Sequence, residues 1–250
     1  MIRARRTLAA LIAGLAFMAL PALAETSVGD AEVVRAEYGD PTTRYAHGVL
    51  GDAVEWGSLI LRVNTCIGCA GLRLEARRIT LPDSRVFEDT APRVVDLGDG
   101  LRAAMVVESD VDRGARLALY GARGLITATP FIGQTHRWLA PIGAGDLDGD
   151  GAVELAYIDR PHLTKRLRVW RFADGALHPV ADLDGLTNHR IGWDFITGGL
   201  RDCGQGPEII VVNADWTQVM AARLHNGTLR ARVIAPYRNS DSVKRALICP

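Results

Sequence analysis

Four carboxylates lie within nine residues in the segment DLDGDGAVE, which runs from Asp146 to Glu154. This spacing places side-chain oxygens at positions 1, 3, 5 and 9 of a loop, and the backbone carbonyl at position 7 adds a fifth, as calcium loops require. Gly149 and Gly151 permit the tight winding that brings these oxygens onto one ion. Such a flexible oxygen cage suits Ca²⁺ better than Mg²⁺, which prefers strict octahedral geometry and retained water. The predicted ligands are Asp146, Asp148, Asp150, the carbonyl of Ala152, and Glu154.

Two other interpretations of this loop are weaker. An EF-hand loop begins in the same way but needs an acidic residue at position 12, where this chain has Tyr157 inside an apolar run. A solvated turn without an ion is the second alternative. Three neighbouring aspartates repel one another, which makes an ion-free loop costly in the folded state. We therefore expect one Ca²⁺ with a structural role.

A second group of polar residues lies in three similar segments, TTRYAHGV, QTHRWLAP and TNHRIGWD. Each carries an arginine and a histidine. Arginine clamps anionic groups, and Tyr or Trp stacks on a sugar or an aliphatic face, so these segments predict a binding face. The alternative is that the same side chains pack the junctions between repeats. The candidate residues are Arg44, Tyr45, His136, Arg137, Trp138, His189 and Arg190.

The elements that must position these residues repeat along the chain. Apolar strands are expected at 58–64, 103–108, 154–159 and 208–213, and their last residues are 44, 51 and 54 positions apart. Each is preceded by a short strand-like run and followed by an alternating strand, a turn and another strand. Two of these turns are Asp-Gly and Asn-Gly, the dipeptides that tight hairpins prefer. The glycines of three turns are Gly124, Gly175 and Gly227.

Four strands in about 50 residues is the pattern of one propeller blade. The predicted fold is all-β: a small β-propeller of four to five blades, forming a single domain over residues 25–250. The alternative, a β-sandwich, does not predict self-similarity at this period. Residues 30–48 are expected to supply an outer strand, which either pairs with the last blade or is the remnant of a fifth. No helix is expected after residue 24. The repeats are about 45–91, 92–139, 140–190 and 191–240.

The segment DLDGDGAVELAYI resembles the FG-GAP or VCBS-type repeat of integrin-like β-propellers. In that family a D-x-D-x-D-G-x-x-D/E loop joins the first two strands of a blade and holds a structural Ca²⁺. The resemblance covers all four repeats, but only the third has the full motif. The others have LGDAVEWGSLIL, DLGDGLRAAMVV and LRDCGQGPEIIVV, so metal ligation is not transferred to them. Familiar members have about seven blades, more than this chain supplies. The chain as a whole also resembles uncharacterised exported proteins of proteobacteria with such repeats.

The first 24 residues have a basic start, an apolar core and the small-residue end Ala22-Leu23-Ala24, which is typical of a secretory signal. A membrane anchor is the alternative, but the apolar run is short for a bilayer span of about 20 residues. Removing residues 1–24 leaves 26 basic and 29 acidic side chains, so the charge indicates neither nucleic acid nor an anionic membrane as a partner. We expect a periplasmic or secreted protein without a later membrane span.

An even number of cysteines in an exported chain favours disulfides. The simplest of three possible connectivities joins Cys66 to Cys69 and Cys203 to Cys249, and the second bond ties the C-terminal tail to the last repeat. The CIGC segment is also compatible with a redox centre, a metal site or free thiols. A redox centre usually begins a helix, however, and here strand-like segments flank the motif.

No GxSxG, HExxH, phosphate-binding glycine loop or CxxCH motif is present, so no catalytic residue is predicted. The sequence favours an exported, calcium-stabilised β-propeller that acts as a non-catalytic binding or scaffold module for a protein or glycan. The alternatives are an envelope hydrolase or lyase acting on an anionic substrate, and thiol-disulfide chemistry at Cys66 and Cys69.

Overall fold

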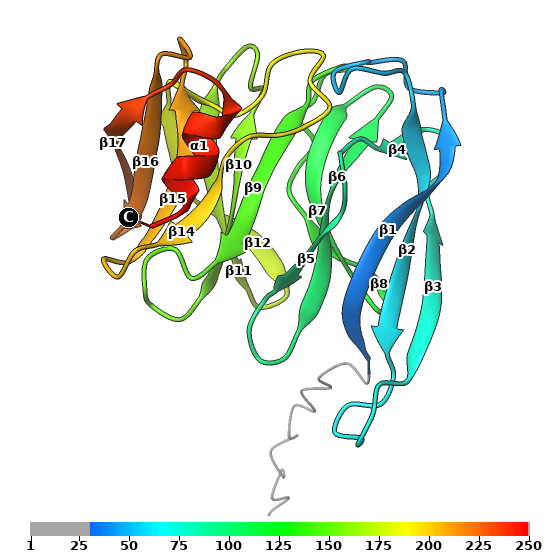
Figure 1. The fold of residues 1–250 in the computed structure, drawn as a ribbon. Helices are drawn as coiled ribbons and strands as arrows, with labels where there is room; N and C mark the ends of the chain where they lie inside the picture. The colour runs from blue at the N-terminus through cyan, green and yellow to red at the C-terminus, as the bar shows by residue number, and fades with distance from the viewer. Residues whose placement is uncertain (1–30, 250) are drawn as a thin grey trace, which may run out of the picture.

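The computed structural model describes residues 31–249, so the predicted secretory signal lies outside the described residues. The chain in this range is all-β, with several antiparallel sheets and one short helix, as Figure 1 shows. The predicted fold class is therefore confirmed at this level. Between residues 31 and 249 there is no helix long and apolar enough to cross a membrane.

The first unit contains β1 (Glu32–Thr42), β2 (Glu55–Asn64), β3 (Leu74–Thr80) and β4 (Arg85–Phe87). Strand β2 lies between β1 and β3, while β4 pairs with both β2 and β6 and joins the first two units into one eight-stranded sheet. Of the two alternatives for the segment before the first repeat, pairing with the last repeat is wrong. Strand β1 pairs with β2 because its apolar side chains pack into the core cluster that β2 forms with the second unit.

The second unit contains β5 (Arg93–Asp96), β6 (Arg102–Asp110), β7 (Gly114–Gly121) and β8 (Gly124–Ala128), paired in that order. These are the four strands that the repeat predicts. The expected first strand of the first repeat, around residues 46–52, has no counterpart here: the structure has turns and bends there.

The third unit is a separate four-stranded sheet in chain order. Its tight turn at Asp174-Gly175 has φ angles of 51° and 72°, the positive values that favour this dipeptide in a hairpin. The strands are β9 (Leu139–Gly145), β10 (Val153–Asp159), β11 (Arg166–Ala173) and β12 (Ala176–Asp184).

The fourth unit contains β14 to β17, and the short β13 (Leu186–Thr187) pairs with the far end of β15. It ends in helix α1 (Ser240–Leu247), which the sequence did not predict because eight residues are too few for a visible helical period. Asn239 caps the helix, and Val243 packs against the sheet. The strands are β14 (Gly199–Asp202), β15 (Pro207–Asn213), β16 (Gln218–His225) and β17 (Thr228–Pro236).

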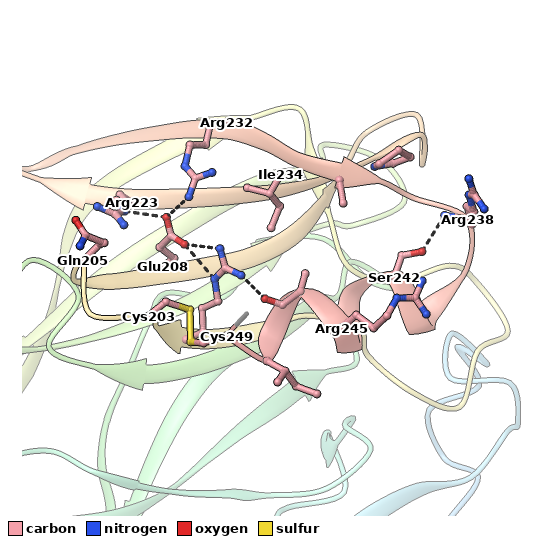
Figure 2. Close-up of a pocket in the computed structure, with 15 residues that line it drawn as sticks. Cys203, Gln205, Glu208, Arg223, Arg232, Ile234, Arg238, Ser242, Arg245 and Cys249 are labelled. Atoms are coloured by element: carbon pink, nitrogen blue, oxygen red, sulfur yellow. Dashed lines mark hydrogen bonds and ion pairs between the residues drawn. A yellow bond between two sulfur atoms is a disulfide. The ribbon is translucent and has the colours of Figure 1, made fainter.

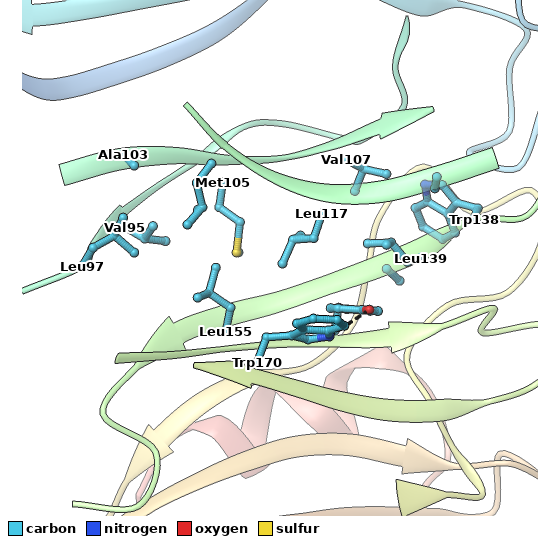
Figure 3. Close-up of a cluster of buried hydrophobic side chains, with 14 of the residues drawn as sticks. Val95, Leu97, Ala103, Met105, Val107, Leu117, Trp138, Leu139, Leu155 and Trp170 are labelled. Atoms are coloured by element: carbon cyan, nitrogen blue, oxygen red, sulfur yellow. Dashed lines mark hydrogen bonds between the residues drawn. The ribbon is translucent and has the colours of Figure 1, made fainter. Parts of the chain in front are cut away.

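The last three units stand side by side (Figure 1). Strand β9 contacts β5 and β14, and β12 contacts β8 and β17, so equivalent strands of neighbouring units adjoin. Apolar side chains from facing sheets fill the space between them, because the central strands are buried on both faces. Figure 3 shows the cluster between the second and third units, which includes Met105, Leu117, Leu155 and Trp170.

Candidate functional site

The predicted calcium loop connects β9 to β10, and its first carboxylate organises the turn. Asp146 Oδ1 accepts N–H groups from Gly149 at 2.7 Å and Asp150 at 3.1 Å, and Oδ2 accepts one from Gly151 at 3.0 Å. The corresponding loops of two other units do the same with Asp96 and Asp202, each of which accepts a backbone N–H two residues on. The shape of the loop is therefore a property of the repeat and does not by itself indicate an ion.

The other three carboxylates of the loop distinguish it from its counterparts. Arg171, opposite Glu154 on β11, donates to Glu154 Oε1 at 2.6 Å and to Asp148 Oδ2 at 2.9 Å, and pairs with Asp150 at 2.8 Å. Glu154 is fully buried, and this burial raises its pKa, against the N–H of Leu147 and the guanidinium of Arg171. One internal cation thus faces three carboxylates directly, with a fourth in the same loop.

The loop fits a hard divalent cation in two respects. Carboxylate oxygens of Asp146, Asp148 and Glu154 lie within 4.8 Å of one another, which is the largest separation of oxygens coordinated to one ion at roughly 2.4 Å. Asp148 Oδ1 is buried and has no hydrogen-bond partner, and an unsatisfied buried carboxylate oxygen is costly. The N–H of Ala152 donates to Asp150 at 2.9 Å, which keeps its peptide in the loop.

The fourth unit compensates the equivalent carboxylate in another way. Glu208 is the second residue of β15, as Glu154 is of β10. Its two carboxylate oxygens accept hydrogen bonds from Arg201, Arg223 and Arg232 at 2.7 to 3.0 Å. Its pKa is lowered to about 2, because the arginines outweigh the effect of its burial. Protein cations saturate this carboxylate, and among the described residues only the third unit has a carboxylate cluster arranged for a metal.

The predicted binding face lies where the linkers between units meet. Gly192 in the linker to the fourth unit donates its N–H to the carbonyl of Val49, in the loop of the first unit, at 3.1 Å. A pocket of about 320 Å³ opens beside this contact, and we call it the linker pocket. It is lined by His47, Val49, His136, Arg137, Trp138, Arg160, Pro161, His162, Leu163 and Ile191.

One wall of the linker pocket is a histidine held by a buried glutamate. His47 Nδ1 lies 2.5 Å from Oε1 of Glu88, whose side chain is fully buried, and Ser109 Oγ contacts Glu88 Oε2. With a carboxylate oxygen as the acceptor of this bond, Nδ1 is the donor and carries the proton. The imidazole of His136 stacks on His47 with ring centroids 4.9 Å apart. Nε2 of His47 has no hydrogen-bond partner among residues 31–249 and is available to a ligand.

A second histidine pair has a defined tautomer. His189 Nε2 donates to the carbonyl of Trp193 at 2.9 Å. Burial lowers the pKa of His189, so the ring is neutral and its Nδ1 is unprotonated. This Nδ1 accepts a hydrogen bond from His162 Nε2 at 2.9 Å. Burial, with a smaller contribution from His189, lowers the pKa of His162 to about 4. His162 is therefore neutral at pH 7 and keeps an unprotonated Nδ1 acceptor.

The aromatic residues of the predicted face do not present their rings to solvent. Trp138 and Tyr45 are 2 % and 3 % exposed. Trp138 Nε1 donates to the carbonyl of Glu88 at 2.8 Å, and Tyr45 Oη accepts the N–H of His136 at 3.0 Å. These two residues pack the junction, which is the alternative that the sequence left open.

Two of the three predicted arginines, Arg44 and Arg190, do not line the linker pocket. Arg44 donates to the carbonyl of Arg85 and pairs with Asp83 at 3.7 Å. Arg190 stacks over the ring of Trp216, 4.6 Å from its centroid. Arg137 lines the pocket, and its only side-chain hydrogen bond within the described residues is a 3.3 Å contact with the carbonyl of His136.

The sequence did not point to Glu88, His162 or Arg160 at this site. His47 stands in the TTRYAHGV segment, one of the three segments expected to form the binding face, but was not among the candidate residues. Glu88 lies 41 residues away on the chain, and no local spacing connects the two. His162 comes from the loop after β10, which the linker comparison did not include.

The cysteines are paired as predicted, Cys66 with Cys69 and Cys203 with Cys249. Among the described residues no cysteine is free. Comparison of the chain with models of known protein families and with the sequences of characterised proteins gave no match. The function of these sites is therefore argued from their geometry.

Proposed function

We propose that the protein is an exported binding module whose linker pocket holds an acidic sugar, free or at the end of a glycan. The observation that carries this proposal is the convergence of His47, His136, Arg137 and His162, from the first three units, on one pocket. A pocket of about 320 Å³ is at the lower end of the range of small-molecule sites, which run from ~300 to ~1,000 Å³.

The chemistry of the wall supports this ligand class. Arg137 offers guanidinium donors to a carboxylate or phosphate, and such charge-assisted bonds are among the strongest in proteins. His162 offers an acceptor at Nδ1 for a hydroxyl group, because its neutral tautomer is fixed by His189. An acceptor for a hydroxyl beside donors for an anion is complementary to a sugar that carries an acidic group.

The scaffold of this module is proposed to be a small propeller of four units. Its support is the adjacency of equivalent strands in neighbouring units and the meeting of linkers at Val49 and Gly192. Export is supported by two disulfides, which persist in oxidising compartments.

A bound Ca²⁺ is proposed to stabilise the third unit. Asp146, Asp148, Asp150 and Glu154 would hold it, with the carbonyl of Ala152, and the support is the close grouping of oxygens with the unpartnered Asp148 Oδ1. When bound, the ion supplies positive charge that neutralises the loop; it has no part in binding the sugar.

The binding proposal is tested by calorimetric titration of the mature protein with glucuronate and glucose 1-phosphate, with glucose as the neutral control. We expect both anions to bind. Arg137→Gln should lower the affinity for each anion about tenfold, because it removes a hydrogen bond to a charged group. Arg62→Gln, an exposed arginine on β2, is the matched control and leaves binding unchanged. Equal heats with glucose, or none with either anion, would contradict the proposal.

The His47–Glu88 pair favours a second candidate function, hydrolysis of an anionic substrate. A buried carboxylate that holds Nδ1–H orients the imidazole so that Nε2 can take a proton from water, as general bases do. We would test p-nitrophenyl phosphate and p-nitrophenyl glucuronide with the wild type, His47→Asn and Glu88→Gln. Turnover that both variants abolish supports an enzyme, and its absence at every pH between 5 and 9 leaves binding as the function.

A further inference from the structure

We infer that the outer face of the fourth unit is a docking groove for a linear acidic polysaccharide. The groove has a volume of about 890 Å³ and lies between the β14–β17 sheet and helix α1, as Figure 2 shows. It is separate from the linker pocket and shares no lining residue with it. We call it the arginine groove, after its five arginines, Arg201, Arg223, Arg232, Arg238 and Arg245.

The charge of this groove is strongly one-sided although the whole chain has a formal net charge of zero. Five arginines line it and Glu208 is the only carboxylate among its lining residues. A concentration of one sign of charge in a concave surface attracts ligands of the opposite sign. The excess of positive charge is therefore local, and the net charge of the whole chain does not reveal it.

The single carboxylate cannot neutralise the arginines. Glu208 accepts from Arg201, Arg223 and Arg232 together, while Arg223 and Arg232 still expose 41 % and 59 % of their side chains. Arg238 and Arg245 are exposed and form no ion pair with any residue in the described part of the chain. Their guanidinium groups are left to bind an anion from outside.

The spacing of the charges favours a chain over a single small anion. Arg232 and Arg238 are separated by six positions along and just beyond β17, which is about 20 Å of extended chain. A ligand that meets both ends needs several anionic groups in a row. Arg230 and His225 continue the basic surface beyond Arg223, in the neighbouring hollow that shares Arg223 and Arg232 with the groove.

The lining also distinguishes among polyanions. None of the described residues that line the groove is aromatic, so they offer no platform on which proteins stack the bases of single-stranded nucleic acids. The apolar residues that line the groove are aliphatic, and Ile234 and Ile248 are the largest of them. Carboxylated or sulfated sugars are polyanions that charge-assisted hydrogen bonds from arginine can hold without base stacking.

The disulfide gives the groove its fixed wall. Cys203 and Cys249 are both lining residues, and their bond holds the tail after α1 against the loop between β14 and β15. Arg201 also donates to the carbonyl of Ala246 in the helix. The sheet side and the helix side of the groove are therefore connected at two places, by Arg201 and by Cys203.

The test is biolayer interferometry of the mature protein against immobilised polygalacturonate and heparin, with dextran and poly(dT) as comparison surfaces, over a series of salt concentrations. We expect the two acidic polysaccharides to bind and dextran not to. The double variant Arg238→Gln/Arg245→Gln should weaken binding about tenfold and lower the slope of log Kd against log salt by roughly two, one for each charge removed. Neither arginine has an ion pair, so the variant is expected to keep its fold, as a melting curve checks.

The matched control is Arg35→Gln/Arg77→Gln, which removes the same charge from exposed positions on β1 and β3. It should leave polysaccharide affinity and salt slope unchanged. Equal weakening by the control would show that binding follows net charge and overturn the groove. Tighter binding to poly(dT) than to either polysaccharide, or no binding to either, would overturn the ligand class.

Discussion

His47 Nδ1 lies 2.5 Å from the carboxylate of Glu88, although the two residues are 41 positions apart and Glu88 is fully buried. The pair fixes the imidazole at the edge of the linker pocket. A hydrogen bond donated to a buried carboxylate orients a histidine and selects its tautomer. The linker pocket thus has a preorganised wall, whether it binds a ligand or acts on one.

Removal of one calcium ligand tests the metal. In the wild type, Ca²⁺ at one hundred times its Kd should stabilise the fold by about 2.7 kcal/mol, and EDTA should reverse the rise in Tm. Asp148→Asn should abolish this difference, since it removes the carboxylate whose Oδ1 has no protein partner. Arg171→Gln should enlarge it, because the variant loses the internal cation that faces three of the carboxylates. Identical melting curves of the wild type in Ca²⁺ and in EDTA would exclude a stabilising ion.

Glu55 should make the protein less stable as the pH rises. Burial, followed by the charge of Glu88, raises its pKa to about 9. Between pH 4.5 and 9 the unfolded state releases this proton and the folded state keeps it, so the free energy of unfolding falls as pH rises through this window. Glu55→Gln should therefore add roughly 1–3 kcal/mol at pH 8 and nothing at pH 4. Urea unfolding at both pH values measures this, with the half-exposed Glu37→Gln as the control; a gain that does not depend on pH would refute the account.

His162 should make the protein less stable as the pH falls. Its pKa is lowered to about 4 by burial, so below pH 6.5 the unfolded state takes up a proton that the folded state refuses. Stability therefore declines as the pH falls from 6.5 to 4, by roughly 1–3 kcal/mol at the lower end. His162→Gln should flatten this decline in urea titrations, whereas His178→Gln, at an exposed position of β12, should not. If stability depends on pH in the same way in the wild type and both variants, the pKa of His162 is not lowered in the folded state.

The two disulfides should differ in their contribution to stability. The Cys203–Cys249 bond closes a loop with a sequence separation of 46 residues, and the Cys66–Cys69 bond one of three. The loop-entropy relation assigns about 4 kcal/mol to the first and about 2 kcal/mol to the second. Urea unfolding of the two double serine variants checks this order. A larger loss from the Cys66/Cys69 variant would contradict it.

Much of the fold was predictable because the repeat is local. Hairpin turns such as Asp174-Gly175 and the apolar central strands are specified by neighbouring residues, and they occur where the sequence places them. The pairing of β1 with β2, and the bridge that β4 makes to β6, depend on contacts between distant segments. Helix α1 was not predicted because eight residues are too few to show a helical period in the sequence.

The candidate sites follow the same division. The carboxylates of the acidic loop are close in sequence and were found, but Arg171, which faces them, comes from the next strand and was not. In the linker pocket, His136 and Arg137 were identified, whereas Glu88 lies 41 residues from His47 and shares no segment with it. Burial also decided the role of Trp138, and a single sequence does not show burial.

The most direct test of the central claim is a titration of the ¹⁵N-labelled imidazole groups with glucose 1-phosphate, followed by long-range ¹H–¹⁵N NMR. The account predicts that Nε2 of His47 and Nδ1 of His162 shift together with one Kd, while the exposed His178 does not move. If the pocket resonances stay fixed while the ligand is in large excess, or all the histidines shift alike, the linker pocket is not the binding site.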